Sequence, residues 1–170
     1  QEISQNLPVY LTDFKVDVLQ GGAGTSTNMN ANEVVANVGL LASGLQTGQY
    51  DSLHPNDDVN MSQSTNDVYP TAVKISVCFA LRSFLPSLKN LVNAFEEKAE
   101  EFKAILKIGR TQLQDAVPMT LGQEFKAYAG TLRKEMAAVE SMVPQLSEIN
   151  LGGTAIGTGI NCDPRHGALV

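Results

Sequence analysis

The sequence predicts a mainly α fold, in which long helices form a bundle and irregular polar loops stand at the helix N-termini. The first observation is that apolar residues recur at helical spacing for about nine turns after Pro70, and again after Thr120. The second is that a helix of about 35 residues exceeds the usual globular length, so it needs partner helices along its sides. The third is that a polar stretch rich in turn-forming residues precedes each helix start.

Composition narrows the class of protein. The chain has 170 residues and is 43% hydrophobic, which is enough for one folded unit with a substantial core. A net charge of -6 and a pI near 4.8, without basic runs, exclude nucleic acid and an anionic membrane surface as main partners. A small anionic substrate still fits, because local hydrogen-bond donors matter more than net charge.

The cysteines and the N-terminus indicate a cellular location. Cys78 and Cys162 lie far apart and show neither a disulfide framework nor the spacing of a zinc site. No stretch approaches the roughly 20 apolar residues that a membrane helix needs, and no signal-peptide pattern opens the chain. We therefore expect a soluble, cytoplasmic protein with no membrane partner.

The first part of the chain contains a glycine-rich loop that leads into a helix. Residues 1–20 alternate loosely between apolar and polar types, which predicts an extended or irregular segment. The glycine-rich loop follows at residues 21–24, and apolar spacing predicts a helix over about 28–43, ended by Gly44 and Gly48. Free N–H groups at such a helix start suit a carboxylate, although the loop taken by itself favours a tight turn followed by a polar helix start.

A second polar strip covers residues 53–69 and precedes the longest predicted helix. Pro70 suits the first turn of this helix, and Pro86 predicts a kink within it. The apolar stripe of the helix consists of Val73, Val77, Leu81, Leu85, Leu88, Val92, Phe95, Ala99 and Phe102.

A third polar strip, residues 109–118, ends in the clearest helix start of the chain. Thr120 and Gln123 have the spacing of a capping box, so a long helix should begin near Thr120. This helix should run antiparallel to its predecessor and bend at Pro144, and a second glycine-rich loop follows at residues 150–161. Its apolar face consists of Leu121, Phe125, Tyr128, Leu132, Met136, Val139, Val143, Leu146 and Ile149.

The three polar strips are rich in Thr, Ser, Asn and Gln and carry no nucleophile paired with its base. No Ser-His-Asp pattern, paired-carboxylate motif or dinucleotide fingerprint is present. Neutral donors at helix N-termini suit a dicarboxylate. They would also stabilise a carboxylate that gains a second negative charge when the neighbouring carbon loses a proton.

Together the three strips resemble the aspartase/fumarase superfamily of lyases. The matching motifs are GGAGTSTNMN at 21–30, SQSTND at 62–67 and GRTQLQDA at 109–116. Ala23 and Thr65 stand where class II fumarases usually carry serine, and Gln112 stands where they carry histidine, as some aspartases also do. The chain is therefore more similar to the aspartase branch.

This resemblance implies an activity and a set of site residues. The reaction would be the reversible deamination of L-aspartate to fumarate and ammonia, through an enediolate held on the β-carboxylate. Thr25, Ser64 and Thr65 would bind that carboxylate. Asn66 and Thr111 would contact the amine or the other carboxylate, and Gln112 would line the same pocket. A second, non-catalytic anion site would comprise His54, Asn56 and Asp57.

The resemblance also implies what the chain lacks. The family's catalytic serine lies in a Gly-Ser-Ser-x-Met-Pro-x-Lys-x-Asn loop that does not occur here, so no catalytic residue is assigned. The missing N-terminal methionine and the apolar run at the other end predict a piece of a longer polypeptide. We expect residues 1–20 to be a remnant of an N-terminal domain or a lead-in segment, and residues 21–170 to be part of the central bundle domain. We expect the isolated chain to be inactive.

Family members are homotetramers in which three subunits contribute to each active site, so a homotetramer is expected here. No cofactor is expected, and no metal ligand cluster is present, which leaves activation by a divalent metal open. Two other functions stay open. One is fumarate hydratase, with malate in place of aspartate, and the other is a non-catalytic helical module that serves oligomerisation alone.

Overall fold

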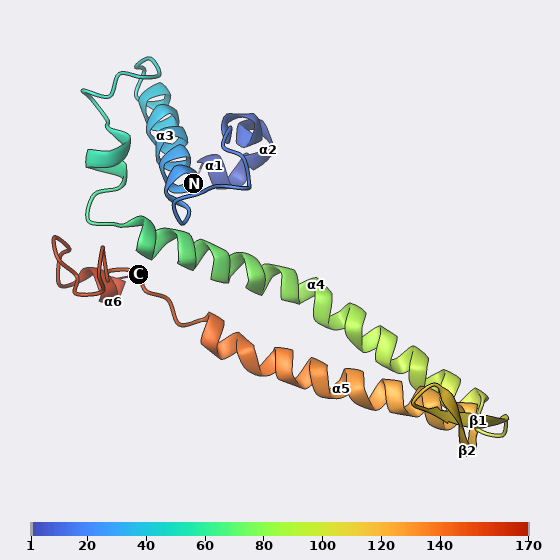
Figure 1. Ribbon diagram of the computed structural model, residues 1–170. Coiled ribbons are helices and arrows are strands. Elements are labelled where there is room, and N and C mark those ends of the chain that lie inside the picture. Colours follow the sequence, from blue (N-terminus) through green and yellow to red (C-terminus); the bar gives the residue numbers. More distant parts are fainter. Residues whose placement is uncertain (1, 170) are drawn as a thin grey trace. The chain divides into compact units, whose positions relative to one another are not determined.

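The computed structural model describes residues 2–169, which form two compact units. The first unit takes in the chain up to Lys74 and again from Ile149, and the second is Ile75–Glu148. Most of the secondary structure is helical, as the ribbon shows (Figure 1), which confirms the predicted fold class.

The first unit begins with short helical turns. They are α1 (Glu2–Gln5), α2 (Leu7–Tyr10) and the 3₁₀ turn η1 (Leu11–Asp13). The prediction of an extended or irregular segment is therefore wrong for most of residues 2–13. Pro8 lies in the first turn of α2, where its missing N–H costs nothing and its fixed φ favours a helix.

Helix α3 (Thr25–Ala42) follows the glycine-rich loop. It begins three residues earlier than the apolar spacing predicts, because Gly24 takes a φ of 90° and turns the chain directly into the helix. Gly44 also has a positive φ, of 76°, consistent with its predicted role in ending the helix. Val34, Ala36 and Leu40 on α3 are buried and supply the core of this unit.

Helix α4 (Thr65–Glu101) starts before Pro70, so the prediction that Pro70 occupies the first turn is wrong. A proline at this position has no N–H to donate to the carbonyl of Asn66, four residues back. The Nδ2 group of Asn150 donates to that carbonyl instead. Two other elements complete the first unit, the π-helical turn η2 (Pro55–Val59) and α6 (His166–Leu169).

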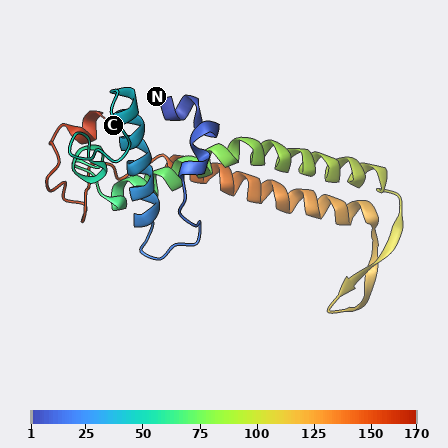
Figure 2. The same ribbon diagram turned by 90° about the horizontal axis from the view of Figure 1, so that it is seen from above.

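In the second unit, α4 pairs with α5 (Leu121–Leu146), and the two views agree that they lie side by side (Figures 1 and 2). The predicted antiparallel pairing is confirmed. The Phe125 ring packs against Phe95 and Phe102, with centroids 5.8 and 5.4 Å apart, and Val92 and Ala129 are buried. Both helices continue through their prolines, Pro86 and Pro144, and the bends predicted there stay predictions.

A β-hairpin joins α4 to α5, and the sequence did not predict it. Strand β1 (Leu106–Thr111) pairs antiparallel with β2 (Gln114–Thr120), so the predicted polar strip becomes most of an exposed two-stranded ribbon. Gln112 and Leu113 form its turn with φ values of 46° and 68°. Neither residue favours this left-handed region, so the turn carries backbone strain.

A charged cluster holds the base of the hairpin to α5. Lys107 of β1 forms an ion pair with Glu124, and the Tyr128 hydroxyl donates to the same carboxylate at 3.0 Å. The hydrogen bond from Lys107, followed by that from Tyr128, lowers the pKa of Glu124. The bond with Glu124 is also the main cause of the raised pKa of Tyr128.

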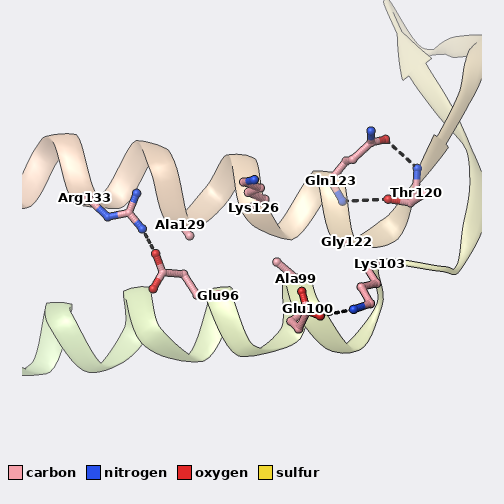
Figure 3. Close-up of a pocket in the computed structure, with 10 residues that line it drawn as sticks. All are labelled: Glu96, Ala99, Glu100, Lys103, Thr120, Gly122, Gln123, Lys126, Ala129 and Arg133. Carbon is pink, nitrogen blue, oxygen red and sulfur yellow. Dashed lines mark hydrogen bonds and ion pairs between the residues drawn. The ribbon is translucent and has the colours of Figure 1, made fainter.

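The start of α5 fits closely against the end of α4 (Figure 3). The predicted capping box is present, with Gln123 N donating to Thr120 Oγ1 at 3.2 Å and Thr120 N donating to Gln123 Oε1 at 2.9 Å. A Cβ atom on Gly122 would lie 2.4 Å from the carbonyl oxygen of Ala99, so only glycine allows this approach. Farther along the two helices, Arg133 of α5 forms an ion pair with Glu96 of α4.

By length and composition, α4 would be able to cross a membrane. The expectation that no stretch approaches a membrane span is therefore wrong by this measure. The core helix of a helical bundle passes the same test, because it is also long and rich in apolar residues. Length and composition are therefore the same for a membrane helix and for a core helix of a bundle.

Candidate functional site

Two helix N-termini meet in the first unit, those of α3 and α4. Gly24, just before α3, is buried against the Tyr69 ring of α4, and a Cβ atom there would lie 2.5 Å from ring carbons. Farther along α3, the Nδ2 group of Asn28 donates to Thr65 Oγ1 at 3.1 Å. The first two of the three polar strips are thereby brought into contact.

The N-terminus of α3 is open to a ligand. Its N-cap residue is Gly24, and no side chain among residues 2–169 caps the helix. The N–H of Thr25 donates to the carbonyl of Gly22 at 3.2 Å. Thr25 is exposed in this first turn, and its hydroxyl donates to the carbonyl of Gly22 at 3.0 Å. Backbone donors and the positive end of the helix dipole favour an anion such as a carboxylate.

The N-terminus of α4 is capped by its own residues. Ser64 Oγ accepts from the backbone N–H of Asn66 at 3.1 Å, and Asp67 Oδ2 accepts from the N–H of Ser64 at 3.2 Å. This reciprocal pair is a capping box with aspartate in the third position. It holds Ser64 and Thr65, both half-buried, at the helix start.

A network of asparagine amides connects the two helix starts. Asn60 Oδ1 accepts from Asn28 Nδ2 at 3.2 Å and from Asn32 Nδ2 at 3.0 Å. The Nδ2 group of Asn60 donates to the carbonyl of Gln63 at 3.4 Å. Sequence reasoning did not assign these asparagines to the site. Their only signal was the spacing of four residues between Asn28 and Asn32, which places both on one face of α3.

The second glycine-rich loop is tied to the start of α4. Asp67 is 1% exposed, and its Oδ2 also accepts from the backbone N–H of Thr154 at 2.9 Å. Asp67 Oδ1 and the buried Thr154 Oγ1 have no hydrogen-bond partner among residues 2–169. Asp67 therefore links the loop to the turn that carries Ser64 and Thr65, a connection that the sequence analysis missed.

Asn66 is held by the same loop. Its Nδ2 group donates to the carbonyl oxygen of Ala155 at 2.8 Å, which orients the side-chain amide. Within the described part of the chain no group donates to Asn66 Oδ1, and the residue is exposed. This oxygen can therefore accept a hydrogen bond from a ligand.

Thr111 and Gln112 belong to the second unit. They lie at the end of β1 and in the hairpin turn, and both are exposed. Thr25, Ser64, Thr65 and Asn66 belong to the first unit, so each unit carries part of the predicted set of site residues.

The residues predicted for a second anion site lie together in η2 and its cap. His54 Nδ1 accepts from the backbone N–H groups of Asn56 and Asp57 at 3.2 and 3.0 Å. It also lies 3.5 Å from Asp57 Oδ2, but an ion pair there would need a proton on a nitrogen that is already an acceptor. Nδ1 is therefore an acceptor from two backbone N–H groups, which leaves Nε2 to carry the ring proton. The capping role explains His54 without a ligand, and the anion site stays a prediction.

The structure contains no group of three or more His, Cys, Asp or Glu side chains placed to hold a metal ion among the residues it describes. The donors at the two helix starts are hydroxyl, amide and backbone N–H groups. Such a set can bind a carboxylate and stabilise added negative charge on it.

A family model described as "Lyase" matches residues 3–170. The chain therefore belongs to this family, the aspartase/fumarase superfamily of lyases. Among curated relatives, it is 61% identical over 158 residues to an aspartate ammonia-lyase of Pseudomonas canavaninivorans. That alignment covers 92% of this chain and 33% of the relative, so the chain spans about a third of the relative's length.

Solved structures give the same classification. A crystal structure titled fumarate lyase:delta crystallin from Brucella melitensis, bound to cobalt, is 58% identical with a TM-score of 0.81, covering 89% of this chain and 33% of that one. A class II fumarase from Schistosoma mansoni is 41% identical with a TM-score of 0.79, covering 91% and 33%. The bundle fold is thus shared with both.

Proposed function

We propose that this chain is part of an aspartate ammonia-lyase that converts L-aspartate to fumarate and ammonia reversibly. The observation that carries the proposal is the meeting of two helix starts, Gly24–Thr25 and Ser64–Thr65, joined by the bond from Asn28 to Thr65. The identity with curated aspartate ammonia-lyases supports aspartate as the substrate.

In this proposal the donors of the first unit bind the β-carboxylate of aspartate. A base removes a proton from the carbon beside that carboxylate, and the electron pair moves onto the carboxylate as an enediolate. The bond from the α-carbon to nitrogen then breaks, giving fumarate and ammonia. Ser64 and Thr65 stabilise the enediolate because they are held in place before charge develops. Thr25 would join them by turning its hydroxyl from the Gly22 carbonyl to the substrate. The base is the family serine, which other parts of the protein would supply.

Asn66 fits a contact with the substrate amine. Its Nδ2 group already donates to Ala155, which leaves Oδ1 to accept from an ammonium group. An ammonium group has only donors, so an oriented amide oxygen suits aspartate. We propose Thr111 and Gln112, at the end of β1 and in the hairpin turn, as further substrate contacts. Another copy of the chain would supply them, as in the superfamily, where three subunits contribute to each active site.

The proposed assembly is a homotetramer with shared active sites. The pairing of α4 with α5 leaves large apolar side chains of α4 exposed, among them Ile75 at 47%, Phe79 at 58%, Phe84 at 50% and Leu91 at 46%. A surface with this much exposed apolar area favours further helices packed against it. We propose that bundle helices of other copies cover it.

Several expectations stay part of this proposal. The enzyme would work in the cytoplasm without a cofactor, and its response to divalent metals is open. Residues 21–170 would belong to the central bundle domain and residues 1–20 to the segment before it. His54, Asn56 and Asp57 would form the second anion site.

Fumarate hydratase is the nearest alternative, since the class II fumarase from Schistosoma mansoni is 41% identical. Gln112, in place of the histidine usual in those fumarases, favours the aspartase. The other alternative is a helical module that serves only oligomerisation. The exposed apolar faces fit it, whereas three strips of hydrogen-bond donors do not, because a scaffold has no need of them.

The Thr111→Ala variant of the full-length lyase that contains this chain tests the enzyme against the scaffold. We expect turnover of L-aspartate to fall strongly while the assembly stays intact by light scattering. Thr131→Ala is the matched control, since Thr131 is an exposed threonine on α5 that donates only to the carbonyl of Ala127. An unchanged rate in Thr111→Ala would remove Thr111 from the site.

A further inference from the structure

We propose that Asn28 is a positioning residue for the elimination, acting through the Thr65 hydroxyl. This inference rests on the proposed function. The amide of Asn28 donates to Thr65 Oγ1, so the hydrogen of that hydroxyl is left free to point at the substrate carboxylate.

Burial makes this bond well defined. Asn28 is 5% exposed, on the fourth residue of α3, while Thr65 is half-buried at the first residue of α4. A buried amide must satisfy both of its N–H groups or lose stability. One donates to Thr65 Oγ1 at 3.1 Å and the other to Asn60 Oδ1 at 3.2 Å.

The direction of the bond follows from the surrounding network. Asn60 Nδ2 donates to the carbonyl of Gln63, which can only accept, so Asn60 Oδ1 must face α3. That oxygen also accepts from Asn32 Nδ2 at 3.0 Å. The side chain of Asn28 must therefore present its NH₂ group to Asn60. Because the Asn28 NH₂ group also contacts Thr65, Thr65 Oγ1 accepts the hydrogen bond between them.

A hydroxyl that accepts one hydrogen bond becomes a better donor in another. Because Asn28 occupies an acceptor position of Thr65 Oγ1, the Thr65 hydrogen has to be directed elsewhere. In the proposed site it points at the β-carboxylate, where negative charge grows as the proton leaves. Without Asn28 the Thr65 hydroxyl can rotate, and a donor that must reorganise stabilises the developing charge less well.

The experiment compares two neighbouring asparagines in the full-length lyase. Asn28→Leu removes the donor to Thr65, whereas Asn32→Leu removes a donor to the same Asn60 oxygen without contacting Thr65. We expect both to lower the melting temperature. Asn28→Leu should lower kcat/KM for L-aspartate by about 10- to 100-fold, somewhat less than the loss of a whole oxyanion donor and far more than Asn32→Leu lowers it.

A double-mutant cycle with Thr65→Val separates positioning from a general effect. If Asn28 acts through Thr65, Asn28→Leu should lower kcat/KM far less in the Thr65→Val protein than in the wild type. An equal loss in both backgrounds would overturn the inference, as would equal losses in Asn28→Leu and Asn32→Leu.

If the leucine variants do not assemble, Asn28→Asp and Asn32→Asp keep the side-chain shape and add the same charge. The carboxylate introduced by Asn28→Asp would accept from the Thr65 hydroxyl and turn its hydrogen away from the substrate. Asn28→Asp should therefore lose more activity than Asn32→Asp. Equal losses would again overturn the inference. A wild-type protein that forms no fumarate from L-aspartate would instead overturn the proposed function.

Discussion

Asp67, in the first turn of α4, accepts a hydrogen bond at 2.9 Å from the backbone N–H of Thr154, which lies 87 residues later in the chain. The same carboxylate accepts from the N–H of Ser64 at 3.2 Å. One buried side chain therefore holds both the turn that carries Ser64 and Thr65 and the glycine-rich loop at residues 150–161. The loop becomes part of the site's support although it contributes no proposed substrate ligand.

Asp67→Ala should reduce the free energy of unfolding by about 1–3 kcal/mol, because buried N–H groups lose their acceptor. Urea denaturation measures this change. Asp51→Ala is the control, since Asp51 is exposed, and its removal should change stability by about 0.5 kcal/mol or less. Equal stabilities of the two variants would show that the Asp67 bonds do not hold the loop.

Gly122→Ala should destabilise the pairing of α4 and α5. The added Cβ would lie 2.4 Å from the Ala99 carbonyl oxygen and 2.7 Å from Lys103 Cα, and such overpacking costs about 1–3 kcal/mol. Gly130→Ala, on the same helix, meets no atom within 4 Å and should stabilise the protein by about 0.5–1 kcal/mol. The melting temperatures of the two variants measure this difference. Melting temperatures that change in the same direction in both variants would contradict the close packing at Gly122.

Lys107→Met should raise the pKa of Glu124 towards its ordinary value, because the hydrogen bond from Lys107 is the main cause that lowers it. A lowered carboxyl pKa adds stability above the unfolded pKa and loses it as the pH falls through the folded pKa. As the pH falls, the Lys107→Met variant should therefore lose less stability through protonation of Glu124 than the wild type does. Titration of the Glu124 carboxyl by NMR measures the shift, and an unchanged pKa would exclude the ion pair.

The helices could largely be predicted from the sequence because their signals are local. The capping box of Thr120 and Gln123 acts within one turn, and α5 begins directly after it. The hairpin could not be predicted in this way. Its turn residues, Gln112 and Leu113, are not the Asn-Gly type that marks such turns, and Pro118 lies within a strand where it cannot donate a hydrogen bond.

The candidate site could be predicted only as separate residues. Thr25, Ser64 and Thr65 stand out because each is a hydroxyl donor at a helix start. Their partners lie far away along the chain, as in the bond from Asn28 to Thr65 across 37 residues. Such a contact depends on tertiary packing, which no local pattern encodes.

The most direct test of the account is the steady-state rate of the full-length lyase with L-aspartate and with L-malate, followed by the ultraviolet absorbance of fumarate. We predict that fumarate forms from L-aspartate with a kcat/KM well above that for L-malate. We also predict that the isolated 170-residue chain forms none. Fumarate formed from L-malate alone would contradict the account in favour of a hydratase, and fumarate from neither substrate would contradict it in favour of a scaffold.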